Sequence, residues 1–343
     1  EMAFATEEDV FEVAENVLYD TFTKFSEKEV SPKPFKKIPY KEAIIKYGTD
    51  KPDLRNPLEI IDVTDIFKNT TFAPFQNLAI RGIKVQEISD KPNSWFNELV
   101  NEAIGSGLKG LGYLKVGSDM SFAGPIDKFL TDEERKQLID AASLTEGSVL
   151  FFIGDKENKV NGLAGIIRTL LGEKLDLINK NKFEFCFITE FPMYEYSEEE
   201  GKYVFTHNPF SMPIGGLDVL LNEKPENIIA HQYDIVCNGI ELSSGAVRNH
   251  DIDIMKKAFE IAGYGEELLK TKFASLYNAF HYGPPPHAGM APGVDRMVML
   301  LREEPNIREV IAFPMNNNAQ DLMMNAPGNV TETQLRDVHI KIR

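Results

Sequence analysis

The segment YDIVCNGIELSSGAVRNH, residues 233–250, limits the fold of this chain more than any other stretch of the sequence. Asn238 and Gly239 lie between two apolar runs, and this dipeptide favours the two-residue turn of a β-hairpin because both residues accept a positive φ. Such a turn places Val236 opposite Glu241. The segment therefore predicts two antiparallel strands, and the short strand-like runs around it predict an antiparallel sheet.

The same hairpin predicts that two carboxylates are neighbours. Side chains alternate between the faces of a strand, so Asp234 shares a face with Val236 and lies diagonal to Glu241. Carboxylates this close repel each other unless a cation lies between them, and Mg²⁺ bridging to phosphate oxygens is the natural candidate. The simpler alternative is an edge hairpin on which both side chains face solvent.

Arg248 follows Glu241 by seven residues, a spacing that puts the two on opposite faces of an unbroken strand. A β-bulge at residues 243–245 restores a common face. The guanidinium then suits a substrate carboxylate, because its planar fork donates two parallel hydrogen bonds. A surface salt bridge is the alternative. His207, at the end of the strand-like run in FTHNPFSMP, is a second candidate ligand-binding group, although a lone histidine is more often structural.

The segment GVDRMVMLL, residues 293–301, predicts an apolar helix with an arginine in its first turn. A cation there opposes the helix dipole, so Arg296 needs a reason outside the helix, such as stacking on adenine while reaching a phosphate. We expect Gly293 to allow a tight turn and Asp295 to cap the helix. The preceding Pro- and Gly-rich stretch, residues 281–292, is expected to be an irregular loop.

Composition narrows the class of protein. Among 343 residues, 37 Lys and Arg stand against 53 Asp and Glu, so the net charge is 37 − 53 = −16. This disfavours indiscriminate nucleic-acid binding but leaves room for a local basic patch. No apolar run reaches the roughly 20 residues of a membrane span and no signal peptide is visible, so a cytoplasmic protein without a membrane contact is expected. Cys186 and Cys237 lie in apolar runs and are expected to be reduced core thiols.

The rest of the chain predicts an α+β fold. Residues 58–155 alternate short strands with helices, one of them capped by Thr131 and Glu134, and form a compact α+β module. The other predicted helices are at 7–25, near 40–47, from about 159, at 252–262 and at 266–281, and a strand is predicted at 308–314.

Taken in order, these motifs closely resemble the bacterial-type aspartyl-tRNA synthetases, a family of class II aminoacyl-tRNA synthetases. The resemblance rests on ITEFPMYEY, FTHNPFSMP, YDIVCNGIELSSGAVRNH, GPPPHAGMAPGVDRMVMLL and VIAFPMNNNAQDLMMNAP, while DLRNPLEIIDVTDIFKN and the module after it resemble the family's inserted domain. It implies an antiparallel sheet flanked by helices and interrupted by an α+β insertion. The implied divisions are catalytic domain 1–52, insertion 53–164, and 165–343 as the second catalytic part with a C-terminal extension.

The resemblance also implies ATP, Mg²⁺, L-aspartate and tRNA(Asp) as ligands, with tRNA(Asn) left open. The implied ATP pocket consists of Glu241, Gly293, Val294, Asp295 and Arg296, in which Arg296 stacks on adenine and reaches the γ-phosphate. The implied Mg²⁺ ligands are Asp234 and Glu241, and the implied aspartate contacts are His207 and Arg248. Aspartyl-adenylate forms first and its aspartyl group then passes to tRNA. Catalysis rests on positioning and charge neutralisation, chiefly by Arg296, Glu241 and Arg248, without a protein nucleophile.

In this family an anticodon-binding barrel and two further motifs, one of which carries the α-phosphate arginine, precede the position of Glu1. The chain is therefore expected to be a C-terminal portion, inactive alone and homodimeric only when full-length. Pro292 replaces an aromatic residue that is frequent at its position. A catalytically inactive paralogue acting as a binding module is the alternative. An asparaginyl-type enzyme is a weaker one, disfavoured by the insertion and by the SGAVR context of Arg248.

Overall fold

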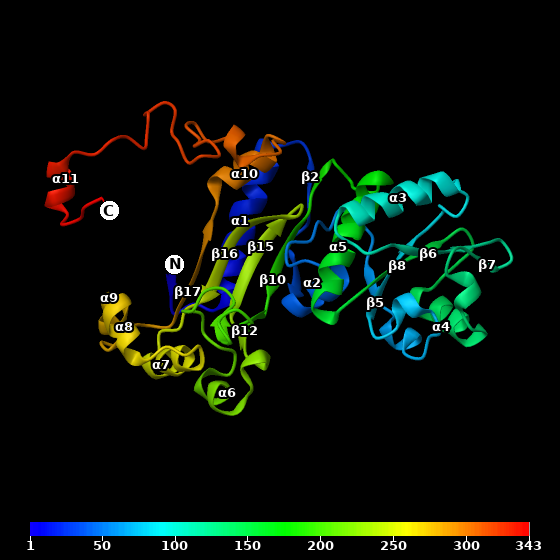
Figure 1. Ribbon diagram of the computed structural model, residues 1–343. Coiled ribbons are helices and arrows are strands. Elements are labelled where there is room, and N and C mark those ends of the chain that lie inside the picture. Colours follow the sequence, from blue (N-terminus) through cyan, green and yellow to red (C-terminus); the bar gives the residue numbers. More distant parts are fainter. Residues whose placement is uncertain (343) are drawn as a thin grey trace. The chain divides into compact units, whose positions relative to one another are not determined.

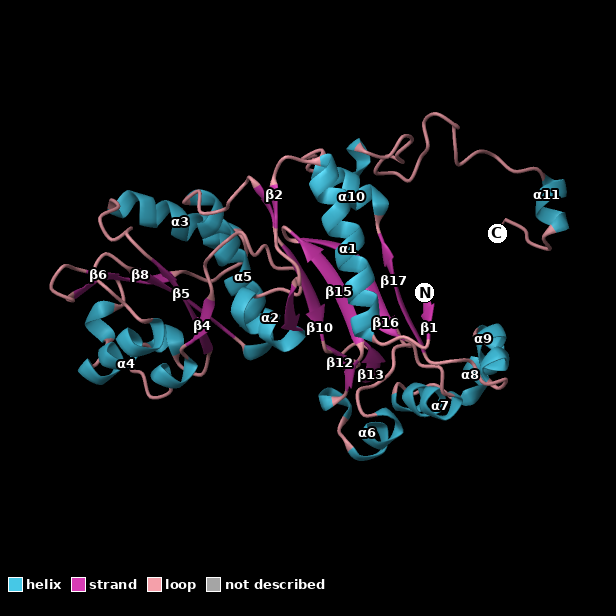
Figure 2. Ribbon diagram, turned by 180° about the vertical axis from the view of Figure 1, so that it is seen from behind, coloured by secondary structure: helices cyan, strands magenta, loops and turns pink. Residues whose placement is uncertain are grey.

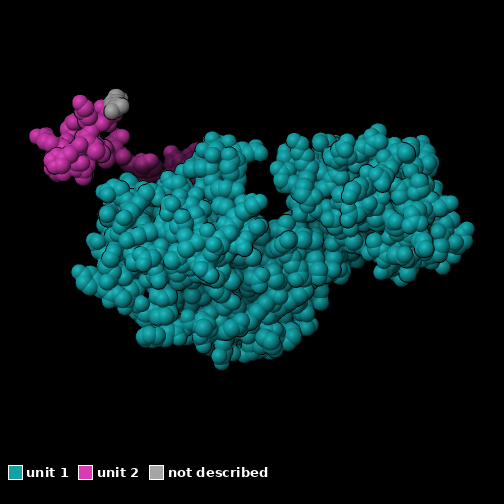
Figure 3. All heavy atoms as spheres, turned by 90° about the horizontal axis from the view of Figure 1, so that it is seen from below, with its two compact units in different colours: residues 1–292 teal, residues 293–343 magenta. Residues whose placement is uncertain are grey.

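The computed structural model describes residues 1–342, which divide into two compact units. The first comprises residues 1–292 and the second starts at Gly293 (Figure 3). Each unit is described by itself below. No helix among the described residues is long and apolar enough to cross a membrane.

A six-stranded sheet forms the centre of the first unit (Figure 1). All neighbouring strands are antiparallel except β10 and β3, which run parallel. Together with the helices on its faces, this sheet confirms the predicted α+β class. In spatial order the strands are β1 (Met2–Ala3), β17 (His287–Pro292), β16 (Ile240–Val247), β15 (Gln232–Cys237), β10 (Phe185–Thr189) and β3 (Lys36–Pro39).

Helix α1 (Glu7–Phe25) covers one face of this sheet (Figure 2). Its Phe11 ring lies 4.2 Å from the ring of Phe187 on β10 and 4.8 Å from that of Tyr233 on β15. The expected start of the helix is confirmed, since the Thr6 backbone N–H donates to the Asp9 carboxylate across the first turn. This aromatic packing buries the α1 face of the sheet over β10 and β15.

The opposite face of the sheet is covered only in part. Helix α2 (Tyr40–Tyr47) packs there on β3 and β10, in a cluster that contains Ile38, Ala43, Tyr47, Cys186, Ile188, Phe191 and Val236. Farther along, Ser244 in the middle of β16 is exposed although its strand is internal to the sheet. This face is therefore open to solvent over β16, and we call it the open face.

A second sheet of five strands stands apart from the first (Figure 1). In spatial order it contains β4 (Ile60–Asp62), β5 (Ala79–Val85), β8 (Val149–Asp155), β6 (Gly112–Val116) and β7 (Phe122–Ala123). Helices α3 (Asn93–Gly105) and α5 (Glu157–Lys174) pack on one face and α4 (Asp132–Ala142) on the other. The Thr131–Glu134 capping box of α4 forms as predicted. Residue 164 falls inside α5, and the domain limits at 53 and 164 stay a prediction.

The remaining elements are short. The strand pairs are β2 (Glu29–Val30) with β9 (Lys182–Phe183), β11 (Phe191–Pro192) with β14 (Ile229–Ala230), and β12 (Tyr194–Ser197) with β13 (Lys202–Phe205). The helices are α6 (Gly216–Asn222), α7 (Ile252–Ile261), α8 (Glu266–Lys272) and α9 (Ala274–Phe280), and the second unit holds α10 (Val294–Leu301) and α11 (Glu332–Asp337).

Three predicted elements were wrong. The expected loop before residue 293 contains β17, because β16 and β1 supply backbone partners on both sides that override its Pro and Gly content. The expected helix at 266–281 is two helices separated at Phe273. Residues 308–314 are not a strand, because no neighbouring strand pairs with them, and a short 3₁₀ turn at Ile307–Glu309 overlaps their start.

Candidate functional site

The hairpin of β15 and β16 has the predicted turn and a bulge one residue away from the predicted position. Asn238 and Gly239 have φ of 53° and 82°, and Val236 pairs with Glu241 as expected. Ile235 then pairs with Ser243, so Leu242 is the extra residue, rather than one at 243–245. The correction follows from pairing across the sheet, which only the tertiary structure sets.

The bulge brings the candidate residues onto the open face. Beyond it Asp234 lies opposite Ser244, and side chains two residues apart share a face, so Arg248 lies on the same side as Asp234. Val236, which shares this face, pairs with Glu241. Arg248 continues the strand beyond β16 through a bridge to Ser211. The predicted common face therefore exists, with Glu241 and Arg248 at its two ends.

Asp234 is a buried carboxylate with unused hydrogen-bonding capacity. It is 3% exposed, and its Oδ1 atom has no hydrogen-bond partner among the described residues. Burial raises the pKa of Asp234 to about 6, against the opposing effect of a hydrogen bond with Ser244, and the nearby charge of Glu241 adds to the rise. A buried oxygen left unpaired is costly, so this atom is suited to a ligand that the protein does not itself supply.

A lysine lies beside the second carboxylate. Lys51, in the loop after α2, places its Nζ atom 3.3 Å from Glu241 Oε2 and 2.6 Å from Asp50 Oδ2. The sequence predicted a cation near Asp234 and Glu241, and this ammonium group is one that the sequence analysis did not find. The sequence placed only a domain boundary nearby, between residues 52 and 53, and nothing local indicated that Lys51 faces a strand nearly two hundred residues later.

The carboxylates of Asp234 and Glu241 could bind a Mg²⁺ ion that is also bound to the phosphates of a nucleotide. Mg²⁺ commonly takes one or two carboxylates and completes its shell with phosphate oxygens and water. The unpaired Oδ1 of Asp234 supplies one oxygen ligand, and the Glu241 carboxylate supplies another. Within residues 1–342 no cluster of three or more His, Cys, Asp or Glu side chains could hold a metal, so the fit depends on phosphate.

His207 belongs to the same neighbourhood. Its ring packs edge-on against Phe191 with centroids 5.0 Å apart. Burial lowers the pKa of His207, while the charges of Asp50 and Glu241 oppose the shift and that of Lys51 reinforces it. The imidazole is therefore neutral near pH 7, with one nitrogen able to accept and one able to donate a hydrogen bond.

Arg248 binds a carboxylate through two parallel hydrogen bonds. Its Nε donates to Glu1 Oε1 at 2.9 Å and its Nη2 to Glu1 Oε2 at 3.1 Å. The hydrogen bond from Arg248 lowers the pKa of Glu1. Gly289 makes room for this pair, since a Cβ atom there would lie 2.1 Å from Glu1 Oε2. Arg248 thus adopts a geometry that recognises carboxylates, with a protein carboxylate as partner in this structure.

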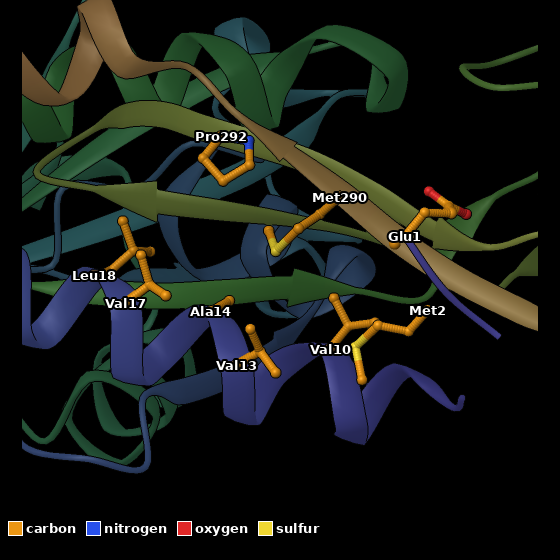
Figure 4. Close-up of a pocket in the computed structure, with 10 residues that line it drawn as sticks. Glu1, Met2, Val10, Val13, Ala14, Val17, Leu18, Met290 and Pro292 are labelled. Atoms are coloured by element: carbon orange, nitrogen blue, oxygen red, sulfur yellow. The ribbon is translucent and has the colours of Figure 1, made fainter. Parts of the chain in front are cut away.

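A cavity of different chemistry lies on the α1 side of the sheet. It has a volume of about 200 Å³, and Val13 and Val17 of α1 extend toward Met290 and Pro292 across it (Figure 4). The other lining residues are Glu1, Met2, Val10, Ala14, Leu18 and Gly289. This lining is mostly apolar and does not suit a triphosphate, so the open face is the better candidate for nucleotide chemistry.

The order of these groups along the chain matches a known family. The family model for tRNA synthetases class II (D, K and N) matches residues 1–317. The chain belongs to this family. An aspartate–tRNA ligase of Streptomyces coelicolor is 48% identical over 343 residues, and an aspartate–tRNA(Asp/Asn) ligase of Rickettsia conorii is 50% identical over 351.

Each alignment covers 100% of this chain and 58% of the relative, so the chain spans less than two thirds of these proteins. A solved aspartyl tRNA synthetase of Entamoeba histolytica matches 91% of this chain and 58% of its own at 17% identity. Its TM-score of 0.33 is too low to add to the family assignment.

In this class II synthetase chain, Gly293 to Arg296 begin α10 of the second unit. The N-cap is Gly293 with φ −79° and ψ 98°, values open to any residue, and no side chain caps the helix. The expected roles of Asp295 as cap and of Gly293 in a tight turn were therefore wrong. Arg296 does lie in the first turn. The part of Gly293, Val294, Asp295 and Arg296 in an ATP pocket stays a prediction.

Proposed function

We propose that this chain is the part of an aspartate–tRNA ligase that binds L-aspartate and ATP on the open face. The observation that carries the proposal is the bidentate carboxylate grip of Arg248, at the opposite end of β16 from the Asp234–Glu241 pair. Seven residues at ~3.3 Å each separate Arg248 from Glu241 by at most about 23 Å, a distance that suits an elongated ligand such as an amino acid in line with a nucleotide.

The nucleotide end of the site is assigned to Asp234 and Glu241. These carboxylates would hold Mg²⁺, which when bound neutralises charge on the ATP phosphates. The unpaired, buried Oδ1 of Asp234 supports this role, because a ligand oxygen has to be available before the metal arrives. Gly293, Val294, Asp295 and Arg296 of the second unit are also proposed to bind ATP, Arg296 through adenine and the γ-phosphate.

The amino-acid end is assigned to Arg248, and His207, which lies near Lys51 and Glu241, is assigned to the part of the substrate that faces the nucleotide. Arg248 would bind the side-chain carboxylate of L-aspartate, as it binds that of Glu1. His207, neutral because burial lowers its pKa, would contact the substrate by hydrogen bonds. A lysine-activating enzyme would need an acidic group where Arg248 stands. With the nucleotide and the amino acid each held at one end of the site, the α-carboxylate of aspartate would be oriented toward the α-phosphorus of ATP.

The proposed reaction has the two steps that the family resemblance implies. The α-carboxylate of aspartate attacks the α-phosphorus of ATP, an aspartyl-adenylate forms and pyrophosphate leaves. The 3′-terminal hydroxyl of tRNA then takes the aspartyl group and AMP leaves. The residues Arg296, Glu241 and Arg248 bind and orient the reactants, and no side chain forms a covalent intermediate.

For the whole protein, the proposed partners are tRNA(Asp) and a second copy of the full-length chain. The proposed location is the cytoplasm. The two relatives named above differ over tRNA(Asn), so charging of both tRNAs has to be measured. Residues 1–343 alone are proposed not to charge tRNA, since they span 58% of those relatives.

The test is aspartate-dependent exchange of pyrophosphate into ATP by the full-length protein. Replacing Arg248→Ala should lower the exchange rate more than about 100-fold, because the bidentate ion pair with the substrate carboxylate is lost. Arg135→Ala is the matched control, since Arg135 pairs with Asp127 in the five-stranded module. Full activity of the Arg248 variant would remove its assigned role. An unmutated full-length protein that binds ATP without aspartate-dependent exchange would favour the inactive paralogue.

A further inference from the structure

The loop that carries Lys51 is fixed where it leaves α2. Gly48 ends that helix with φ +73°, and its N–H donates to Ile44 O at 3.1 Å. A Cβ atom on Gly48 would lie 2.3 Å from Asn161 O and 2.5 Å from the Cα of Gly165, both on α5. The loop therefore starts in direct backbone contact with α5, and only glycine fits this position.

A buried arginine fixes the far end of the same loop. Arg168 on α5 is 2% exposed. Its Nε donates to Leu58 O at 2.6 Å, and its Nη2 donates to Asn56 O at 2.7 Å and Asp53 O at 3.0 Å. Asn56 returns a hydrogen bond from Nδ2 to Arg168 O at 2.8 Å. The backbone of the loop is thus held on both sides of Lys51.

Lys51 keeps its charge in this place. Burial works against the charged form, but the carboxylates of Asp50 and Glu241 outweigh it and raise the pKa of Lys51. The side chain is 37% exposed, and a cavity of about 560 Å³ lined by Lys51, Asp53, Arg168 and Gly239 lies beside it. The backbone is therefore held while the ammonium group has space to move.

We propose that Lys51 is a tethered counter-ion of Glu241 and a phosphate-binding residue of the proposed ATP site. This rests on the proposed function. Without metal, Lys51 neutralises the carboxylate that would otherwise repel Asp234 across the hairpin. When the Mg²⁺ complex of ATP binds, Glu241 exchanges the ammonium for the metal, and Lys51, still tethered beside it, contacts the phosphate oxygens.

Two effects of opposite sign follow. A divalent ion without nucleotide has to compete with Lys51 for Glu241, so removing the ammonium should tighten metal binding by about two- to fivefold, the range of a partly exposed ion pair. The complete metal–ATP complex gains a contact from Lys51, so removing it should weaken that complex by about tenfold, the value of a charge-assisted hydrogen bond. A residue that only supports the loop would weaken both.

The experiment uses the full-length protein with Mn²⁺ as the probe. Free Mn²⁺ is followed by electron paramagnetic resonance with and without a non-hydrolysable ATP analogue, in Lys51→Met, Lys51→Arg and Lys46→Met variants. Lys46 pairs with Glu42 on the surface of α2 and controls for the loss of one charge. We expect opposite shifts in Lys51→Met, and near-normal constants in Lys51→Arg and Lys46→Met.

Weaker binding in both measurements, or no change in either, would overturn the inference. Lys51→Gln serves as a second variant, and thermal melting confirms that each protein is folded. The proposed function is scored separately by aspartate-dependent pyrophosphate exchange of the unmutated protein. If that exchange is present while Lys51→Met binds metal and nucleotide normally, only the role of Lys51 fails.

Discussion

The two sheets of the first unit treat buried charge in opposite ways. In the five-stranded sheet, Arg81 is 2% exposed and each nitrogen of its guanidinium has a partner. Nη2 lies 2.6 Å from Glu157 Oε1 and Nη1 lies 2.9 Å from Asp62 Oδ1, while Nε donates to Asn161 Oδ1. In the six-stranded sheet, Asp234 is equally buried and one of its oxygens has no partner among the described residues.

The five-stranded sheet has hydrophobic clusters on both faces, and six of seven residues in β5 and in β8 are buried. The six-stranded sheet has such packing on one face and an open region on the other. A buried charge that is fully paired supports a fold, whereas one left unpaired is maintained at a cost to stability and is suited to a ligand.

The largest effect is expected in the five-stranded sheet. Phe151 on β8 is fully buried and lies near Phe96 and Tyr113. Phe151→Ala should lower the free energy of unfolding by about 3–5 kcal/mol, because it removes apolar contacts and leaves a cavity. Urea denaturation of the chain measures this. Ile104→Ala, at a half-exposed site on α3, is the control and should cost much less. Similar losses for the two variants would contradict the tight packing of this sheet.

Substitution of Asp234 is expected to raise the free energy of unfolding moderately, whereas substitution of Phe151 lowers it. Because its pKa is raised to about 6 in the folded state, the folded protein holds a proton that the unfolded chain releases near 3.8, and this contribution to stability is lost as pH rises between those values. Asp234→Asn should therefore stabilise the chain at pH 7 by up to ~3 kcal/mol, at 1.36 kcal/mol per pKa unit, and by much less at pH 4.

Melting temperatures of the two proteins across this pH range test the point. Binding of Mn²⁺ with an ATP analogue to the full-length protein should fall in the same Asp234→Asn variant. A variant that is less stable at pH 7 would mean that Asp234 is satisfied in the fold after all.

The smallest effect is expected at Glu1. Its carboxylate is half exposed, so Glu1→Gln should change the stability of the chain by less than ~1 kcal/mol although it weakens a bidentate pair. Denaturant midpoints of the variant and the parent chain provide the measurement. A loss of several kcal/mol would show that the Arg248 pair supports the fold, as Arg81 does, rather than standing where a ligand carboxylate can bind.

Local patterns predicted what depends on local sequence. The Asn238-Gly239 turn, the start of α1 and the capping box of α4 follow from neighbouring residues, and each was confirmed. The strand β17 could not be found this way, because it forms only when β16 and β1 offer their backbone groups. The bulge at Leu242 was displaced by one residue for the same reason.

The residues of the candidate site differ in the same way, since some could be predicted from local sequence and one could not. Asp234, Glu241 and Arg248 come from one hairpin, so strand alternation predicted their common face once a bulge was allowed. Lys51 reaches Glu241 from a distant loop whose path is set by Gly48 and Arg168. No periodicity in the sequence encodes that path, and only the packed structure reveals it.

The close approach of Gly48 to Gly165 also bears on how such a chain can change over time. The long stretch between these residues leaves α2 and returns on α5 at neighbouring points. A few residues can bridge points so close, and joining them directly carries little entropic penalty. Genetic loss, gain or exchange of the whole stretch can therefore occur in one event without pulling the six-stranded sheet apart.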